Sequence, residues 1–263
     1  MTHVTSFLRS LTIQRQVIHA LLMREVITRF GRENLGVLWL VGEPMIFTLG
    51  VATLWGAAGL NHGSSMPIVA FAITGYSSVL LWRNTVSRCN SGIQQNLSLL
   101  YHRNVRVIDV FLTRIMLETA GATASFVVLA TIFLAFDWID APVDLLTVIG
   151  GWLLLCWFGA ALAILIGAAT AYSELVDRLW HPASYLLFPL SGAAFMVDWL
   201  PPAGQELVLM LPMVHGVEMV RDGYFGDIVR THYSAGFLAV NNLVLTLLGL
   251  FVLRDAAHRA GGK

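Results

Sequence analysis

The sequence predicts an all-α membrane protein with six transmembrane helices, and three observations lead to this prediction. Of the 263 residues, 57% are hydrophobic and only 12% are charged, and the mean hydropathy of +0.72 exceeds that of soluble domains. Long apolar stretches recur along the whole chain. The basic residues are arginines except for Lys263, and most of them lie in the polar segments between the apolar stretches.

A helix needs about 20 apolar residues to cross about 30 Å of hydrocarbon, and six apolar stretches come near or exceed this length. The second and fifth stretches are shorter than this length and the third is longer, so the ends of the spans are approximate. The expected spans are Leu35 to Gly59, Pro67 to Trp82, Val110 to Phe136, Leu145 to Ala171, Ala183 to Trp199, and Ala235 to Leu253.

The distribution of basic residues predicts the orientation of these spans. An even number of spans places both termini on one side of the membrane. With the termini inside, fourteen of the sixteen basic residues lie on the inner side, and only Arg221 and Arg230 lie outside. This bias follows the positive-inside rule. We therefore expect a multi-pass protein with both termini in the cytoplasm.

The first 34 residues are expected to form a unit separate from the transmembrane domain of residues 35–263. From Leu11 to Phe30, apolar residues recur at helical spacing, and arginines occupy the other faces. This pattern favours an amphipathic helix lying on the membrane surface, although a soluble cap packed on its own loops is the alternative. The polar start lacks the features of a removed signal peptide, so we expect this segment to be retained.

Two inner segments offer surfaces to a soluble partner. The first, Arg83 to Asp109, is polar with a compact apolar patch, and the second, Tyr172 to Pro182, mixes acidic, basic and apolar residues. Each segment is compatible with a short helix that contacts a partner. The alternative, equally supported by these residues alone, is that both segments only cap the ends of long transmembrane helices.

The fifth span and the outer segment after it are expected to be irregular. Pro182 opens the span and Pro189 removes a backbone donor midway, so a continuous helix is not expected. The segment from Ala203 to Ser234 contains apolar runs too short to span. It is therefore expected to form two short re-entrant helices that narrow the outer exit.

Ionisable residues within spans are candidates for function because the bilayer makes an unpaired charge costly. Arg114 and Glu118 are four residues apart, which favours a local pair on one helix face. Glu43 lacks such a local partner and either meets Arg83 or faces a polar pathway. Most tryptophans fall near span ends, where an interfacial belt accounts for them, and stacking on sugar rings is the alternative.

The sequence lacks the motifs of an enzyme. It contains no zinc-protease His-Glu-x-x-His spacing and no Gly-x-Ser-x-Gly nucleophile elbow, and Cys89 and Cys156 are not placed to pair. A phosphate-binding loop requires a lysine followed by Ser or Thr, whereas Lys263 is the last residue. The chain therefore lacks an ATPase motif of its own, and neither catalytic nor metal-binding residues are expected.

Four blocks resemble bacterial capsular polysaccharide export permeases of the ABC-2 type. The entry to the first span, Arg29-Phe-Gly-Arg-Glu-Asn-Leu-Gly-Val-Leu-Trp39, is followed by Pro44 and is similar to that of ABC-2 export permeases. The resemblance to the capsular permeases is carried by Asn96 to Asp109, Trp180 to Gly192 with its continuation to Pro201, and Leu211 to Gly226. Together the blocks cover most of the chain.

The resemblance implies a homodimer in the bacterial inner membrane that exports lipid-linked acidic capsular polysaccharide. Two copies of a separate ABC ATPase subunit, which binds ATP and magnesium, are implied beneath it. Their closure is expected to rock the subunits and open a path between the first and fifth spans of the dimer. Periplasmic and outer-membrane export partners and membrane lipids are also expected, and no nucleic acid.

The resemblance also assigns residues to three sites. The ATPase contacts are Leu97, Leu99, Leu100, Tyr101, Leu175, Asp177, Arg178 and Trp180. The path for the substrate or its lipid phosphate comprises Arg29, Arg32, Trp39, Glu43, Trp82, Arg83 and Tyr185. The periplasmic gate comprises Asp198, Trp199, Pro212, His215 and Tyr224.

Gly31 and Glu33 stand where relatives often have a basic and a small hydroxyl residue, which leaves Arg29, Arg32 and Arg83 as the better phosphate candidates.

Other functions remain as alternatives. A permease for O-antigen or teichoic acid shares the same six-span plan. A secondary transporter is more remote, because the halves show no convincing internal repeat. A membrane enzyme needs a clustered catalytic set, which the sequence lacks.

Overall fold

A computed structural model describes residues 2–30, 36–57, 67–100 and 105–261, and the regular structure in these ranges is helical. The helices are α1 (Thr2–Phe30), α2 (Gly36–Ala57), α3 (Ile68–Asn90), α4 (Gly92–Gln95), α5 (Leu97–Leu100), α6 (Val107–Ala135), α7 (Leu145–Ala169), α8 (Glu174–Leu190), η1 (Val197–Trp199), α9 (Pro202–Val208), α10 (Pro212–Phe225), η2 (Gly226–Ile228) and α11 (Ala235–Gly261).

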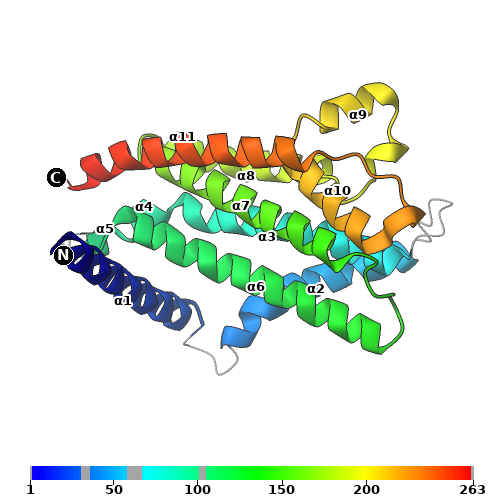
Figure 1. Ribbon diagram of the computed structural model, residues 1–263, viewed down its shortest axis with the longest axis horizontal. Helices are drawn as coiled ribbons and strands as arrows, with labels where there is room; N and C mark the ends of the chain where they lie inside the picture. The colour runs from blue at the N-terminus through cyan, green and yellow to red at the C-terminus, as the bar shows by residue number, and fades with distance from the viewer. Residues whose placement is uncertain (1, 31–35, 58–66, 101–104, 262–263) are drawn as a thin grey trace.

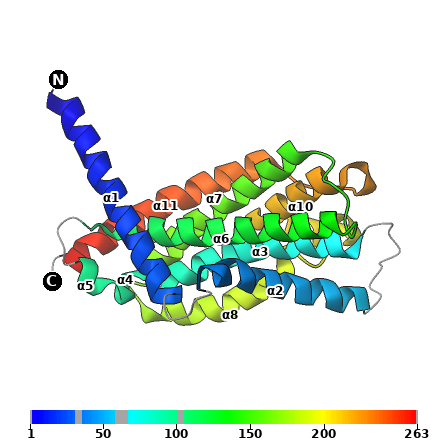
Figure 2. The same cartoon turned by 90° about the horizontal axis from the view of Figure 1, so that it is seen from below.

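The long helices run side by side along the length of the molecule (Figure 1). The amino- and carboxy-terminal ends lie at one end of the bundle together with α4 and α5, whereas α9 lies at the opposite end. We call these the inner and outer ends. Figure 2 shows α1 crossing the bundle obliquely and projecting away from it, rather than joining it as a parallel member.

Five of the six predicted apolar stretches fall largely on one helix, namely α2, α3, α6, α7 or α11, whereas the fifth, Ala183 to Trp199, only begins on the second half of α8. Of the helices in the described ranges, three are both long and apolar enough to cross a membrane, namely α6, α7 and the Ala235–Ala256 part of α11. Two of the other helices differ from these three in composition or length. α3 continues past Trp82 into the polar residues Arg83 to Asn90, and α8 is only 17 residues long.

The fifth stretch, Ala183 to Trp199, is not one continuous helix, as predicted, because α8 ends at Leu190 and a turn leads from there to η1. The role expected of the two prolines was wrong. α8 is one helix that begins at Glu174, well before Ala183, and contains both Pro182 and Pro189. Pro182 lies on an exposed face, and Pro189 lies in the last turn of α8. The irregular backbone begins only after α8, at Ser191 and Gly192, where Gly192 takes a φ of 83°.

The second inner segment is consequently the start of α8 and not a separate helix. Ser173 caps α8, because its hydroxyl accepts a hydrogen bond of 3.1 Å from the backbone N–H of Leu175. The first inner segment does contain two short helices, α4 and α5, each of four residues.

α7 lies at the centre of the bundle, where it packs against α3, α10 and α11. Its close contact with α10 depends on residues that have no side chain. A Cβ atom on Gly151 would lie 2.9 Å from the backbone nitrogen of Val220, and one on Gly223 would lie 2.6 Å from that of Val148. Small residues allow such backbone contact between membrane helices. The outer helix α10 is thereby held in the core.

We expect the substitution Gly151→Ala to destabilise the protein by about 1–3 kcal/mol, because the added methyl group overpacks the α7–α10 contact. Thermal unfolding of the detergent-solubilised chain measures this effect. Gly50→Ala in α2 is the control, because a Cβ there meets nothing within 4 Å. Equal melting temperatures for the two variants would contradict the proposed packing.

Candidate functional site

A cavity of about 320 Å³ opens between α2, α3 and α8. It has an apolar part and a polar part with hydroxyl, amide, imidazole and guanidinium groups. The lining residues are Phe47, Tyr76, Leu80, Arg83, Asn84, Ser87, Arg88, His181, Ser184 and Tyr185. The mixture of an aromatic surface with cationic and neutral hydrogen-bond donors suits sugars and anionic groups.

Two residues predicted for the substrate path meet in this cavity. The guanidinium carbon of Arg83 lies 4.6 Å from the centre of the Tyr185 ring, and 66% of Tyr185 is exposed. This is a cation–π contact at an accessible site. Trp82, predicted for the same path, lies elsewhere. Its side chain is fully buried and packs edge-on against Phe158 of α7, so the structure assigns it to the core.

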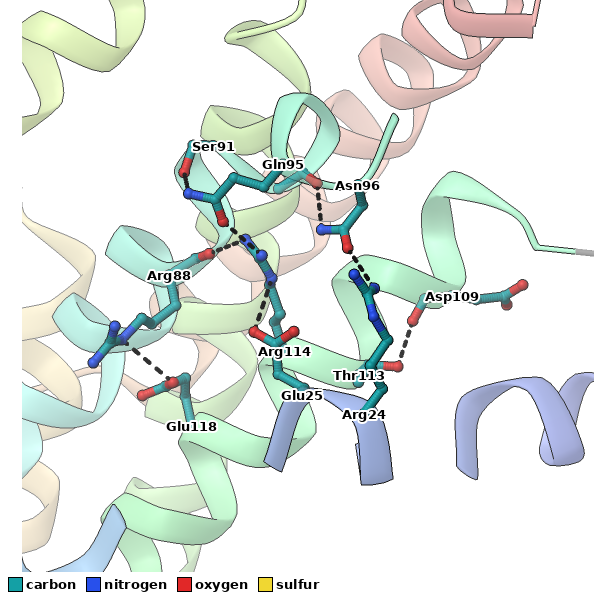
Figure 3. Close-up of polar contacts among 11 residues, drawn as sticks. Arg24, Glu25, Arg88, Ser91, Gln95, Asn96, Asp109, Thr113, Arg114 and Glu118 are labelled. Atoms are coloured by element: carbon teal, nitrogen blue, oxygen red, sulfur yellow. Dashed lines mark hydrogen bonds and ion pairs between the residues drawn. The ribbon is translucent and has the colours of Figure 1, made fainter. Parts of the chain in front are cut away.

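A cluster of charged and amide side chains lies beside this cavity, where α1, α3, α4 and α6 meet (Figure 3). Arg114 of α6 is at its centre. Its guanidinium donates to the Arg88 carbonyl oxygen at 2.7 Å and to Gln95 Oε1 at 2.8 Å, and its Nε lies 3.4 Å from Glu25 Oε1. Arg114 therefore connects α6 to three other helices.

The predicted pairing of Arg114 with Glu118 was wrong, because the ion pairs in this cluster join different helices. Glu118 lies 3.6 Å from Arg88 Nε on α3, and Arg114 pairs with Glu25 on α1. Each of these two buried side chains meets an opposite charge on a neighbouring helix. The i,i+4 rule considers only residues of the same helix, so it does not predict such pairs.

Two further hydrogen bonds hold α1 against the bundle. Arg24 donates to Asn96 Oδ1 at 3.1 Å, and Gln14 donates to Asp109 Oδ1 at 3.0 Å. A second cavity, of about 370 Å³, lies between α1 and these helices, and Ser87 and Arg88 line both cavities. The two cavities thus flank the same polar end of α3.

Arg24, Arg88, Gln95 and Asn96 were not predicted as site residues from the sequence. Arg88 was recognised only as part of the positive-inside pattern. A carboxylate within a span, such as Glu118, favours a cationic partner, and the arginines at the inner end of α3 are candidates on neighbouring helices.

The residues of α8 that were predicted to contact a partner lie on two different faces of the helix, one exposed and one packed against α3. Leu175 and Arg178 are exposed, and Arg178 lies 3.3 Å from Glu174 one turn earlier. Trp180 is only 5% exposed and donates from its indole nitrogen to Ser87 Oγ at 3.2 Å, and Asp177 accepts a hydrogen bond from Asn90. Trp180 and Asp177 therefore fasten α8 to α3.

Several predicted residues fall where the structure gives less detail. Leu99 is half-buried on α5. Leu97, Leu100, Arg29, Trp39 and Glu43 belong to helices, but their side chains are not among those described. Arg32 and Tyr101 lie outside the described residues.

The five predicted gate residues all lie at the outer end. Asp198 Oδ1 lies 3.2 Å from His232 Nε2, and Trp199 stacks on Phe71 of α3 with ring centres 5.4 Å apart.

Pro212 opens α10, and Tyr224 near its end donates to the Asp140 carbonyl oxygen at 2.7 Å. His215 Nδ1 accepts from the Ser234 N–H at 3.0 Å, and its Nε2 lies 2.8 Å from the Leu209 carbonyl oxygen. These contacts connect α10 to the segments on both sides of it.

Burial affects two of these outer groups. It lowers the pKa of His215, opposed by the hydrogen bond to the Leu209 carbonyl, which favours the neutral ring that accepts from Ser234. Burial also raises the pKa of Tyr224 to about 12, so its hydroxyl remains a donor. Among the described residues there is no group of three His, Cys, Asp or Glu side chains that could hold a metal ion.

The chain is similar in sequence to proteins that are named for the export or transport of capsule polysaccharide or polysialic acid. The "Capsule polysaccharide export inner-membrane protein BexB" of Haemophilus influenzae is 44% identical over 251 residues, 95% of each chain. The corresponding protein CtrC of Neisseria meningitidis serogroup B is 46% identical over 248 residues, 94% of each chain. The "Polysialic acid transport protein KpsM" of Escherichia coli is 26% identical over 250 residues, 92% of this chain and 94% of that protein.

The family model "ABC-2 type transporter" matches residues 16–225, which include α2 through α10 and most of α1. On this match, and on the identity over nearly the full length of the two capsule export proteins, the chain belongs to the ABC-2 type transporter family.

Proposed function

We propose that this chain is the permease subunit of an ABC exporter that moves lipid-linked acidic capsular polysaccharide across the bacterial inner membrane. The observation that carries the proposal is the identity of 44–46% to capsule polysaccharide export proteins over about 95% of the chain. The functional unit is a homodimer of six-span subunits with two copies of a separate ATPase. O-antigen and teichoic acid are the alternative cargoes.

The inner end of the bundle faces the cytoplasm in this proposal. The two ends of the chain, α4 and α5 all lie there (Figure 1). Arg24, Arg83, Arg88 and Arg114 line the two cavities beside α3, near this end. Arginines on the cytoplasmic side agree with the positive-inside rule. The helix α1, docked through Glu25 and Gln14, then lies at the inner membrane surface.

The cavity between α2, α3 and α8 is the entry site for the lipid-linked end of the polymer. Arg83 provides a permanent positive charge for a phosphate or an acidic sugar, and Tyr185 provides an aromatic face. α2 and α8 lie on the same side of the bundle in Figure 2, where a second subunit would complete the path. α9 and α10 act as the outer gate.

The exposed residues at the start of α8 receive the ATPase. Leu175 and Arg178 project from the first turns of the helix, whereas Trp180 and Asp177 hold the same turns against α3. A force applied to Leu175 and Arg178 is thereby delivered to α8 and α3 together. ATP and magnesium belong to the partner subunit.

We expect Arg83→Ala to lower surface capsule about tenfold, because the variant loses the cation that recognises the anionic group, an interaction worth about 1.5 kcal/mol or more. Arg83→Lys keeps the charge without the planar contact on Tyr185 and should export at an intermediate level. Quantitative capsule staining of complemented cells measures export. Arg230→Ala, an exposed arginine at the outer end, is the control. Full export by Arg83→Ala would rule out this entry site.

We expect Leu175→Asp to reduce transport-coupled ATP turnover about fivefold or more, because burying an unpaired charge in a subunit contact costs more than 1 kcal/mol. The assay uses the purified permease–ATPase complex in lipid nanodiscs. Leu175→Met preserves an apolar surface of similar size and should retain coupling. Unchanged turnover in the aspartate variant would remove this surface from the contact.

A further inference from the structure

The irregular backbone after α8 is held by a charged side chain from α10. Nη1 of Arg221 donates to the carbonyl oxygens of Gly192 and Phe195, both at 2.6 Å, and Nη2 donates to that of Ala193 at 2.7 Å. Arg221 is fully buried. A single guanidinium therefore provides the hydrogen bonds that helical geometry would otherwise supply to this turn.

α3 closes the other side of the Arg221 site. The guanidinium carbon lies 3.9 Å from the centre of the Phe71 ring, and Phe71 in turn stacks on Trp199. Gly75 leaves the space that the guanidinium and the turn occupy, because a Cβ atom there would lie 2.5 Å from the Ala193 carbonyl oxygen and would also meet Nη2 of Arg221. The turn is thus enclosed between α3 and α10.

Glu218, three residues before Arg221 on α10, extends the same attachment. Its carboxylate is fully buried and accepts hydrogen bonds from the backbone N–H groups of Val197 at 3.3 Å and His232 at 3.0 Å. α10 therefore binds the segment after α8 through both carbonyl and N–H groups, and it also binds the connection that leads into α11. Opposite charges one helical turn apart reduce the cost of burying each.

We propose that Arg221 is a positioning residue that makes the outer end of α8 and α10 one rigid unit, so that a movement begun at the inner end of α8 reaches the outer helices. α8 runs from Leu175 and Arg178 at one end to the Arg221 site at the other. α10 in turn contacts α7 backbone to backbone at Gly151. This inference rests on the proposed export function, because it assigns the outer helices a part in the transport cycle.

The experiment uses the complete permease–ATPase complex in lipid vesicles and nanodiscs. Three measurements are made: ATP turnover, ATP-dependent transfer of capsular polymer into vesicles, and the distance distribution between spin labels at Leu190 and Asp227. The labels are attached to cysteines introduced at these two positions in a protein that lacks Cys89 and Cys156, the two free cysteines.

The variant Arg221→Met fills the space of the arginine side chain without its hydrogen-bond donors. Asp222→Asn is the matched control, because Asp222 bonds Thr231 and Tyr233 but not the turn after α8.

We expect Arg221→Met to retain ATP turnover, to lose polymer transfer about tenfold or more, and to broaden the distance distribution, since the three charge-assisted hydrogen bonds to the turn are lost. Gly75→Ala should give the same result while Arg221 is intact, which covers the case in which Arg221→Met does not fold. Asp222→Asn should resemble the wild type.

Wild-type transfer together with a narrow distance distribution in both test variants would overturn the inference. An equal loss of polymer transfer in Asp222→Asn would also overturn the inference, because any substitution at the outer end would then reduce transfer, whether or not it touches the turn after α8. A wild-type complex that moves no capsular polymer would reject the proposed function instead. In that case the distance distributions still decide whether Arg221 fixes α8 to α10.

Discussion

The fold depends on one requirement: polar groups buried inside an apolar bundle must find partners within the protein. Arg114 meets this requirement at the inner end, where it joins α6 to Glu25 of α1, to the end of α3 and to Gln95 of α4. Arg221 meets it at the outer end, where three backbone carbonyl groups converge on one guanidinium. Because an isolated buried charge is costly, each arginine fixes the relative positions of the segments that bind it.

α8 runs between the inner end of α3 and the turn that Arg221 holds, and in the proposed function it links a separate ATPase to the outer helices. Its first turns carry exposed side chains and are fastened to α3 by Trp180 and Asp177. Its middle forms one wall of the cavity that contains Arg83 and Tyr185. Its outer end leads into the turn held by α10. In the proposed function, one helix therefore touches the motor surface, the entry cavity and the outer gate.

The sequence predicted the positions of α2, α6, α7 and α11 to within a few residues at most of their ends, because a helix long and apolar enough to cross lipid requires a continuous apolar stretch. It did not predict that α8 begins at Glu174 and continues through Pro182 and Pro189, because proline in a helix interior usually breaks or kinks the helix. It paired Arg114 with Glu118 and placed Trp82 on the substrate path. The structure pairs Arg114 with Glu25 instead and buries Trp82 against Phe158. The face that a residue presents depends on how the helices pack, and spacing within one helix does not encode this.

The central claim is that this chain moves capsular polysaccharide, and the glycan that accumulates in cells lacking the chain tests it most directly. Cell fractionation followed by chemical analysis of the retained glycan gives both its location and its identity. The account predicts lipid-linked acidic capsule polymer in the cytoplasm and a bare cell surface. Accumulated O-antigen or teichoic acid, or a normal capsule at the surface, would contradict it.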